Sequence, residues 1–181
     1  MKLSSISRNS NFFTAKHLAS LGLFSAFCVV GRLSFSWLPN VSPTTTILLL
    51  ICFYWGLSDA LIVANLMVVA TGLYLGMGYW IFEQMLTYSA ILLIYYFLIK
   101  IDILKKLISQ ILIAFLFGIL YGFIISLCEV FIFKINFFWA YYGAGISFDF
   151  MHAIGNFFFM LILMKPFEQL WRKFRQLTKI T

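Results

Sequence analysis

Apolar stretches alternate along the chain with short segments that carry glycine, proline or charged residues. Six such stretches are predicted, at about 17–38, 44–57, 60–76, 80–99, 107–133 and 146–165. Prolines follow the first stretch and glycines follow the third, as expected of turns between helices. Because a helix needs about 20 apolar residues to cross a bilayer, the pattern predicts an all-α integral membrane protein. It would form a single membrane domain of six transmembrane helices.

Composition leaves little room for anything else. Of the 181 residues, 63% are hydrophobic and only 10% are charged, whereas about 25% of the residues of a soluble domain are charged. Cys28, Cys52 and Cys128 each stand alone in an apolar stretch, without metal-ligand or redox spacing. We expect them to be packing residues.

Basic residues predict the topology. Eleven of the 13 lysines and arginines lie in the two terminal segments and around 100–106, and only Arg32 and Lys134 lie elsewhere. The positive-inside rule therefore places both termini in the cytoplasm. Residues 166–181 form a basic amphipathic tail, predicted either to lie along the inner membrane surface or to be a snorkelling helix end.

Ionisable residues inside apolar stretches are costly unless they face a cavity or a partner. Those found here are Arg32, Asp59, Glu83, Glu129, Asp149 and His152. Asp59 is expected to cap a helix at a cytoplasmic turn. The other five fall in the outer halves of their stretches. On a helix, Asp149, His152 and Asn156 would share one inward face.

Small residues predict two packing surfaces. One stripe of the fifth stretch consists of Gly118, Gly122, Ser126 and Glu129. It predicts close helix approach at its inner end, with a carboxylate at its outer end. In the first stretch, Gly22 and Ala26 form a second small patch, toward the cytoplasm. Arg32 is expected to snorkel, to form an ion pair with Glu83, Glu129 or Asp149, or to contact a ligand.

Catalytic signatures are missing from the sequence. His152 has no second histidine at metalloprotease spacing, and neither a G-x-S-x-G stretch nor a nucleotide-binding loop occurs. Polar residues gather at one end of the spans, which favours a binding protein or transporter subunit. An intramembrane enzyme using His152 and Asp149, or a scaffold, is the alternative of another class.

Three segments of the chain resemble a known family. They are Arg32 with WLPNVSPTT at 37–45, GMGYW at 76–80 with Gln84 after it, and FDFMHAIGN at 148–156 with Lys165-Pro166 beyond. Together they resemble the substrate-binding S components of energy-coupling factor (ECF) vitamin transporters, most closely the cobalamin-specific group. The resemblance covers about residues 16–175. Tyr79 and Glu83 depart from it, since a proline and an uncharged residue are commoner there.

The resemblance implies a multi-pass subunit of the bacterial plasma membrane that captures a vitamin, with cobalamin the first choice. A pyridoxine-like vitamin or a queuosine precursor is the alternative. It further implies a transmembrane coupling protein and two cytosolic ATPases as partners, which alone bind and hydrolyse ATP. The chain itself would be no enzyme, would hold no cofactor or metal and would bind no nucleic acid. Gly22 and Ala26 match the positions that contact the coupling protein.

The predicted ligand site combines rings and polar groups. Residues expected to line or cover the ligand are Trp37, Asn40, Trp80, Trp139, Tyr141 and Tyr142. Residues expected to supply hydrogen bonds are Arg32, Glu83, Gln84, Asp149, His152 and Asn156. For each single aromatic residue, a place in the interfacial belt is the competing interpretation.

Overall fold

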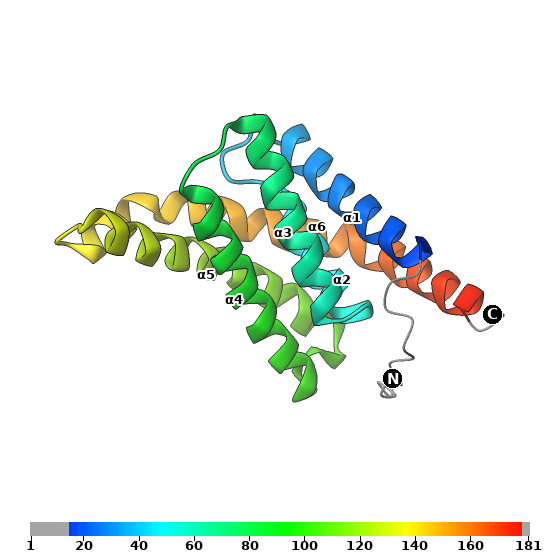
Figure 1. The fold of residues 1–181 in the computed structure, drawn as a ribbon. Helices are drawn as coiled ribbons and strands as arrows, with labels where there is room; N and C mark the ends of the chain where they lie inside the picture. Colours follow the sequence, from blue (N-terminus) through cyan, green and yellow to red (C-terminus); the bar gives the residue numbers. More distant parts are fainter. Residues whose placement is uncertain (1–14, 179–181) are drawn as a thin grey trace.

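The computed structural model describes residues 15–178, and this part of the chain is helical with no strand (Figure 1). The helices are α1 (Ala15–Ser34), α2 (Thr44–Tyr54), α3 (Leu57–Leu75), α4 (Trp80–Lys100), α5 (Leu107–Phe133) and α6 (Phe138–Thr178), with a short 3-10 turn, η1 (Ile103–Lys105), before α5. Among the described residues, five helices are long and apolar enough to cross a membrane. The all-α prediction is therefore confirmed.

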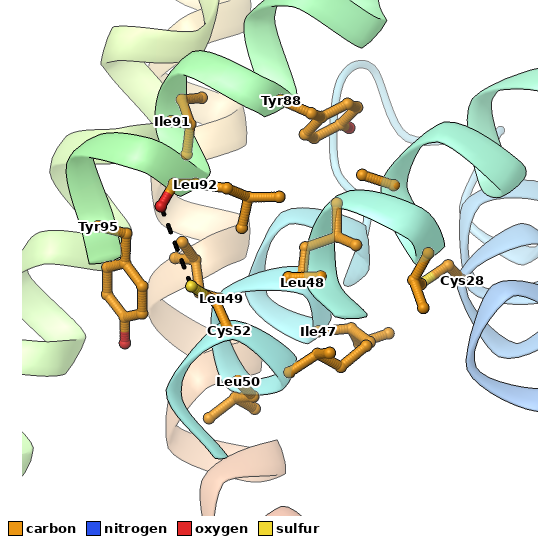
Figure 2. Packing of buried hydrophobic residues seen from close by; sticks show 14 of the residues in the cluster. Cys28, Ile47, Leu48, Leu49, Leu50, Cys52, Tyr88, Ile91, Leu92 and Tyr95 are labelled. Carbon is orange, nitrogen blue, oxygen red and sulfur yellow. Dashed lines mark hydrogen bonds between the residues drawn. The ribbon is translucent and has the colours of Figure 1, made fainter. Parts of the chain in front are cut away.

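Helix α2 is the exception, since its 11 residues extend only about 16 Å, against a hydrocarbon core of about 30 Å. Every residue from Thr44 to Cys52 is at most 2% exposed. It contacts all five long helices. Figure 2 shows Leu49 and Cys52 of α2 packed near Leu92 and Tyr95 of α4. The second apolar stretch is thus a short central helix, and the predicted count of six spans is not confirmed.

The outer surface is apolar. Four large side chains from different helices, Leu23, Leu73, Phe82 and Phe131, are each more than 70% exposed. Soluble proteins rarely present so much apolar surface, and helices satisfy their backbone hydrogen bonds internally, as lipid requires. The surface is that of a membrane-embedded protein.

Helix α6 begins at Phe138, eight residues before the predicted start at 146. Most of the aromatic segment expected to be a loop is therefore helical, and only 134–137 connects α5 to α6. Phe138 and Tyr142 lie one turn apart and stack with ring centroids 5.8 Å apart, and both contact Phe123 of α5. These ring contacts stabilise two helical turns despite the glycines that follow.

Helices α5 and α6 approach most closely where the glycine stripe was predicted. A methyl group added to Gly118 would overlap the backbone of Ala153, and one added to Gly122 would overlap the carboxyl group of Asp149. By contrast, no atom lies within 4 Å of a methyl group placed on Gly22. The stripe on α5 is therefore a packing surface, whereas Gly22 on α1 faces outward.

Aromatic residues pack the helices together at the end of the bundle where α1 begins and α6 ends. Helix α6 continues through Pro166, so the described part of the predicted tail, up to residue 178, is helical, and 179–181 lie outside the described residues. Phe167 and Trp171 pack against Trp55, with the two tryptophan rings 5.0 Å apart. Figure 1 shows the start of α1 and the end of α6 at the same end of the molecule.

A histidine–carboxylate contact joins α1 and α3 at this end. His17 Nε2 lies 3.0 Å from Asp59 Oδ2. No side chain caps α3, whose preceding residue is Gly56 at φ 108°, a conformation that favours glycine. The predicted capping role of Asp59 is wrong, because its carboxylate faces His17 instead.

Replacing Gly118 with alanine should lower the free energy of unfolding by about 1–3 kcal/mol, because the added methyl group must push α5 away from α6. Unfolding in one detergent, followed by circular dichroism, measures this. The matched control is Gly22→Ala, which should leave stability unchanged or raise it by up to about 1 kcal/mol. Equal effects of the two changes would contradict the packing role.

Candidate binding site

A cavity of about 710 Å³ lies at the end of the bundle away from the basic tail. Its walls come from the end of α1, the irregular segment 35–42, the first turns of α4, the last turns of α5 and the first half of α6. This irregular segment lies between the end of α1 at Ser34 and the start of α2 at Thr44. Asn40 in this segment has φ 57°, which asparagine tolerates better than most residues.

Three carboxyl groups from three helices line the cavity. Glu83 of α4 is 4% exposed and Asp149 of α6 is 5% exposed, while Glu129 of α5 is half-buried. Glu83 and Glu129 lie near each other, and Glu83 Oε1 is buried without a hydrogen-bond partner among the described residues. In the turn before α4, the nearby Glu129 carboxylate raises the pKa of the Tyr79 phenol.

Arg32 is the one cationic side chain in this lining. Its Nη1 donates a hydrogen bond of 2.7 Å to Gln84 Oε1, and its guanidinium carbon lies 6.0 Å from the centre of the Trp80 ring. The described residues contain no ion pair of Arg32 with an acid. Of the predicted roles, pairing with an acid is therefore not observed, and the guanidinium lies at the cavity wall.

His152 connects the irregular segment to α6. Its Nδ1 lies 2.9 Å from the main-chain oxygen of Asn40, and its Nε2 lies 2.9 Å from Thr45 Oγ1. Because a carbonyl oxygen only accepts, Nδ1 carries the hydrogen, and in the neutral ring Nε2 accepts from the threonine hydroxyl. Asn40 Nδ2 in turn donates to the main-chain oxygen of Phe148 at 3.0 Å. These bonds hold one wall of the cavity in place.

Asn156 lies deeper and does not line the cavity. Its side-chain Nδ2 donates to Ala114 O at 3.2 Å, and its main-chain oxygen accepts from Thr46 Oγ1 at 3.3 Å. The predicted polar face of α6 is therefore divided by depth. Asp149 and His152 reach the cavity, whereas Asn156 joins α6 to α2 and α5.

The structure brings most of the predicted site residues together. Those that line the cavity are Arg32, Asn40, Trp80, Glu83, Gln84, Tyr141, Asp149 and His152. Of the others, Trp37 and Trp139 are each 74% exposed, and Tyr142 stacks on Phe138. The exposed tryptophans fit the interfacial-belt interpretation better than ligand contact.

Sequence reasoning missed two tyrosines in the lining, Tyr88 and Tyr121. Their rings are 5.1 Å apart, and the Tyr121 ring also lies 5.1 Å from that of His152. A signal was available for Tyr88, which follows Gln84 by one helical turn and therefore shares its face. Tyr121 adjoins Gly122, but a tyrosine in an apolar helix gives no signal of its own.

The arrangement suits binding better than catalysis. Both ring nitrogens of His152 are occupied by structural contacts, so the ring is poorly placed to act as a general base. Among residues 15–178, no group of three or more histidine, cysteine or acidic side chains is placed to hold a metal ion. The site can offer carboxylates, one guanidinium, amides and aromatic faces to a ligand.

None of the protein families, curated proteins and solved structures compared with this chain matches it. The resemblance to S components therefore depends on the sequence motifs alone.

Replacing Thr45 with valine keeps the side-chain volume but leaves Nε2 of His152 buried without its partner. We expect the free energy of unfolding to fall by about 1–3 kcal/mol, measured by denaturant unfolding in detergent. Thr71→Val is the matched control, because the equally buried Thr71 hydroxyl bonds only to carbonyls of its own helix, and it should cost less than about 1 kcal/mol. A control as destabilised as Thr45→Val would count against the wall contact.

Proposed function

We propose that this chain is the substrate-binding membrane subunit of an ECF-type importer in the bacterial plasma membrane, capturing a vitamin outside the cell. The observation that supports this most is the cavity of about 710 Å³, which lies within the range of roughly 300–1,000 Å³ typical of small-molecule sites. Its wall carries buried polar side chains from several helices, as expected of a site that orients a polar ligand.

The distribution of basic residues supports an orientation in which the cavity faces the outside of the cell. The cavity lies at the end away from the basic residues that follow Lys165, and the positive-inside rule assigns the basic end to the cytoplasm. The cavity mouth then faces outward. A ligand would enter from outside, displace water and contact the acids and aromatic rings.

Transport would depend on partners. The proposed partners are a transmembrane coupling protein and two cytosolic ATPases, which supply the energy. Gly22 and Ala26 are exposed on α1, and the space beside Gly22 is open. Small residues let a partner helix approach closely, so this patch is the proposed contact with the coupling protein.

The size of the cavity bears on the ligand. Cobalamin is the vitamin implied by the closest resemblance, but a complete corrinoid is larger than the cavity and would project through its mouth. A smaller micronutrient, such as a pyridoxine-like vitamin or a queuosine precursor, would be enclosed. Cobalamin and the two smaller micronutrients are therefore all tested as ligands of the purified subunit.

We expect one vitamin of a broad panel to bind the purified subunit in detergent at micromolar concentration or below, measured by isothermal titration calorimetry. Cells lacking other routes should take up the same radiolabelled compound only when the chain, the coupling protein and the ATPases are all present. Uptake that persists after deletion of this chain would overturn the proposal.

Bulky residues on the α1 patch should separate binding from transport. The double change Gly22→Leu and Ala26→Leu should reduce uptake at least about tenfold, because leucine side chains prevent close helix contact, while ligand affinity stays within about twofold. Ala140→Leu is the control, since Ala140 is an exposed small residue on α6 outside the cavity and the patch. Equal uptake by the double variant and the unmodified chain would exclude this contact surface.

A further inference from the structure

Negative charge predominates in the cavity. Glu83, Glu129 and Asp149 line it together with the single cation Arg32, and no lysine is part of the lining. The Asp149 carboxyl group occupies the space that a side chain on Gly122 would fill. The site therefore offers three acids against one base, although the chain as a whole has a formal net charge of +7.

Glu83 is the acid whose surroundings say most about this excess of negative charge. It is 4% exposed, lines the cavity, and its Oε1 atom has no hydrogen-bond partner among the described residues. A buried carboxylate oxygen without a donor costs free energy. The neighbouring Glu129 adds a second acid rather than a donor of opposite charge, so the pair is best satisfied by a cation from outside the chain.

We infer that the ligand of this cavity is a small planar heterocycle that presents a protonated nitrogen to Glu83 and Glu129. The inference rests on the proposed function and narrows its substrate class. An ammonium or amidinium group supplies the N–H donors that the two carboxyl groups lack. Trp80, Tyr88 and Tyr121 line the same cavity as these acids, and aromatic rings of this kind suit a flat ligand.

Arg32 and Gln84 also line the cavity and offer polar groups to the ligand. Their mutual hydrogen bond uses Nη1 of the guanidinium, and the guanidinium has further N–H donors for a ring nitrogen or carbonyl oxygen. An anionic ligand would gain this one cation but would face all three acids. A carboxylated vitamin is therefore disfavoured relative to an amine of the same size.

Matched probes test the charge requirement. The probes are pyridoxamine against pyridoxine, and 7-aminomethyl-7-deazaguanine against its 7-cyano analogue, with thiamine as a further cation and 4-pyridoxate, biotin and cobalamin as competitors. Calorimetry on the purified subunit gives each affinity. We expect at least one cationic probe to bind at least about tenfold more tightly than its uncharged partner.

Two isosteric variants test whether Glu83 and Glu129 cause the preference for a cationic probe. Glu83→Gln and Glu129→Gln should each reduce or abolish this preference, with at least about tenfold loss of affinity for the cationic probe and a change within about twofold for the uncharged one. Asp102→Asn is the control, because Asp102 lies in an exposed turn at the other end of α4. Size-exclusion profiles and melting temperatures establish that the variants are folded.

The outcomes distinguish the inference from the proposed function. Tighter binding of pyridoxine, 4-pyridoxate, biotin or cobalamin than of every cationic probe overturns the inference but supports a vitamin-binding subunit. A cationic preference that survives in both glutamine variants also overturns it. Failure of every probe to bind, together with no uptake that depends on the chain, overturns both.

Discussion

The central helix α2 has no side that faces lipid or water, because five longer helices enclose it. At 11 residues it is too short to continue to the end of the bundle where α1 ends and α4 begins. The chain reaches it through the irregular segment 35–43, whose polar backbone groups need partners in an apolar environment. His152 supplies part of this requirement by donating a hydrogen bond to the main-chain oxygen of Asn40. The cavity is thus formed where a short central helix gives way to a segment that cannot fill the same space.

The close approach of α5 and α6 places an acid beside this cavity. Gly118 lets the two backbones pack against each other, and Gly122 leaves room for the Asp149 carboxyl group. With any larger residue at these positions, Asp149 would have to be displaced or the helices separated. The polar groups at this end are therefore set by packing between α5 and α6 as much as by their own hydrogen bonds.

The apolar pattern predicted the long helices well, with α5 at the expected bounds and α4 within one residue of them. It failed for α2, because a helix that is hydrophobic on all sides has the same pattern whether lipid or other helices surround it. The early start of α6 was also missed, since Gly143 and Gly145 are typical of loops and the stacking of Phe138 on Tyr142 is a three-dimensional contact.

Polar residues were located better than aromatic ones. An ionisable residue in an apolar stretch must face something polar, so Glu83, Asp149 and His152 were predictable as inward-facing. A tryptophan or tyrosine has no such constraint and is stable in the core, in the cavity wall or at the membrane interface. Its place depends on the length and tilt of each helix, which the sequence does not encode locally.

Helix α1 is the element through which the two ends of the proposed subunit are connected. Arg32 lies at the cavity, and Gly22 lies ten residues earlier, about 15 Å along the same helix. Only four α1 residues, Leu21, Phe24, Ser25 and Cys28, are buried, so the helix is held on one narrow face. In the proposed function, Arg32 contacts the ligand at one end of this rigid helix, and the open small-residue patch contacts the coupling protein near the other end. Helix α1 would then couple ligand binding to the coupling protein without a rearrangement of the core.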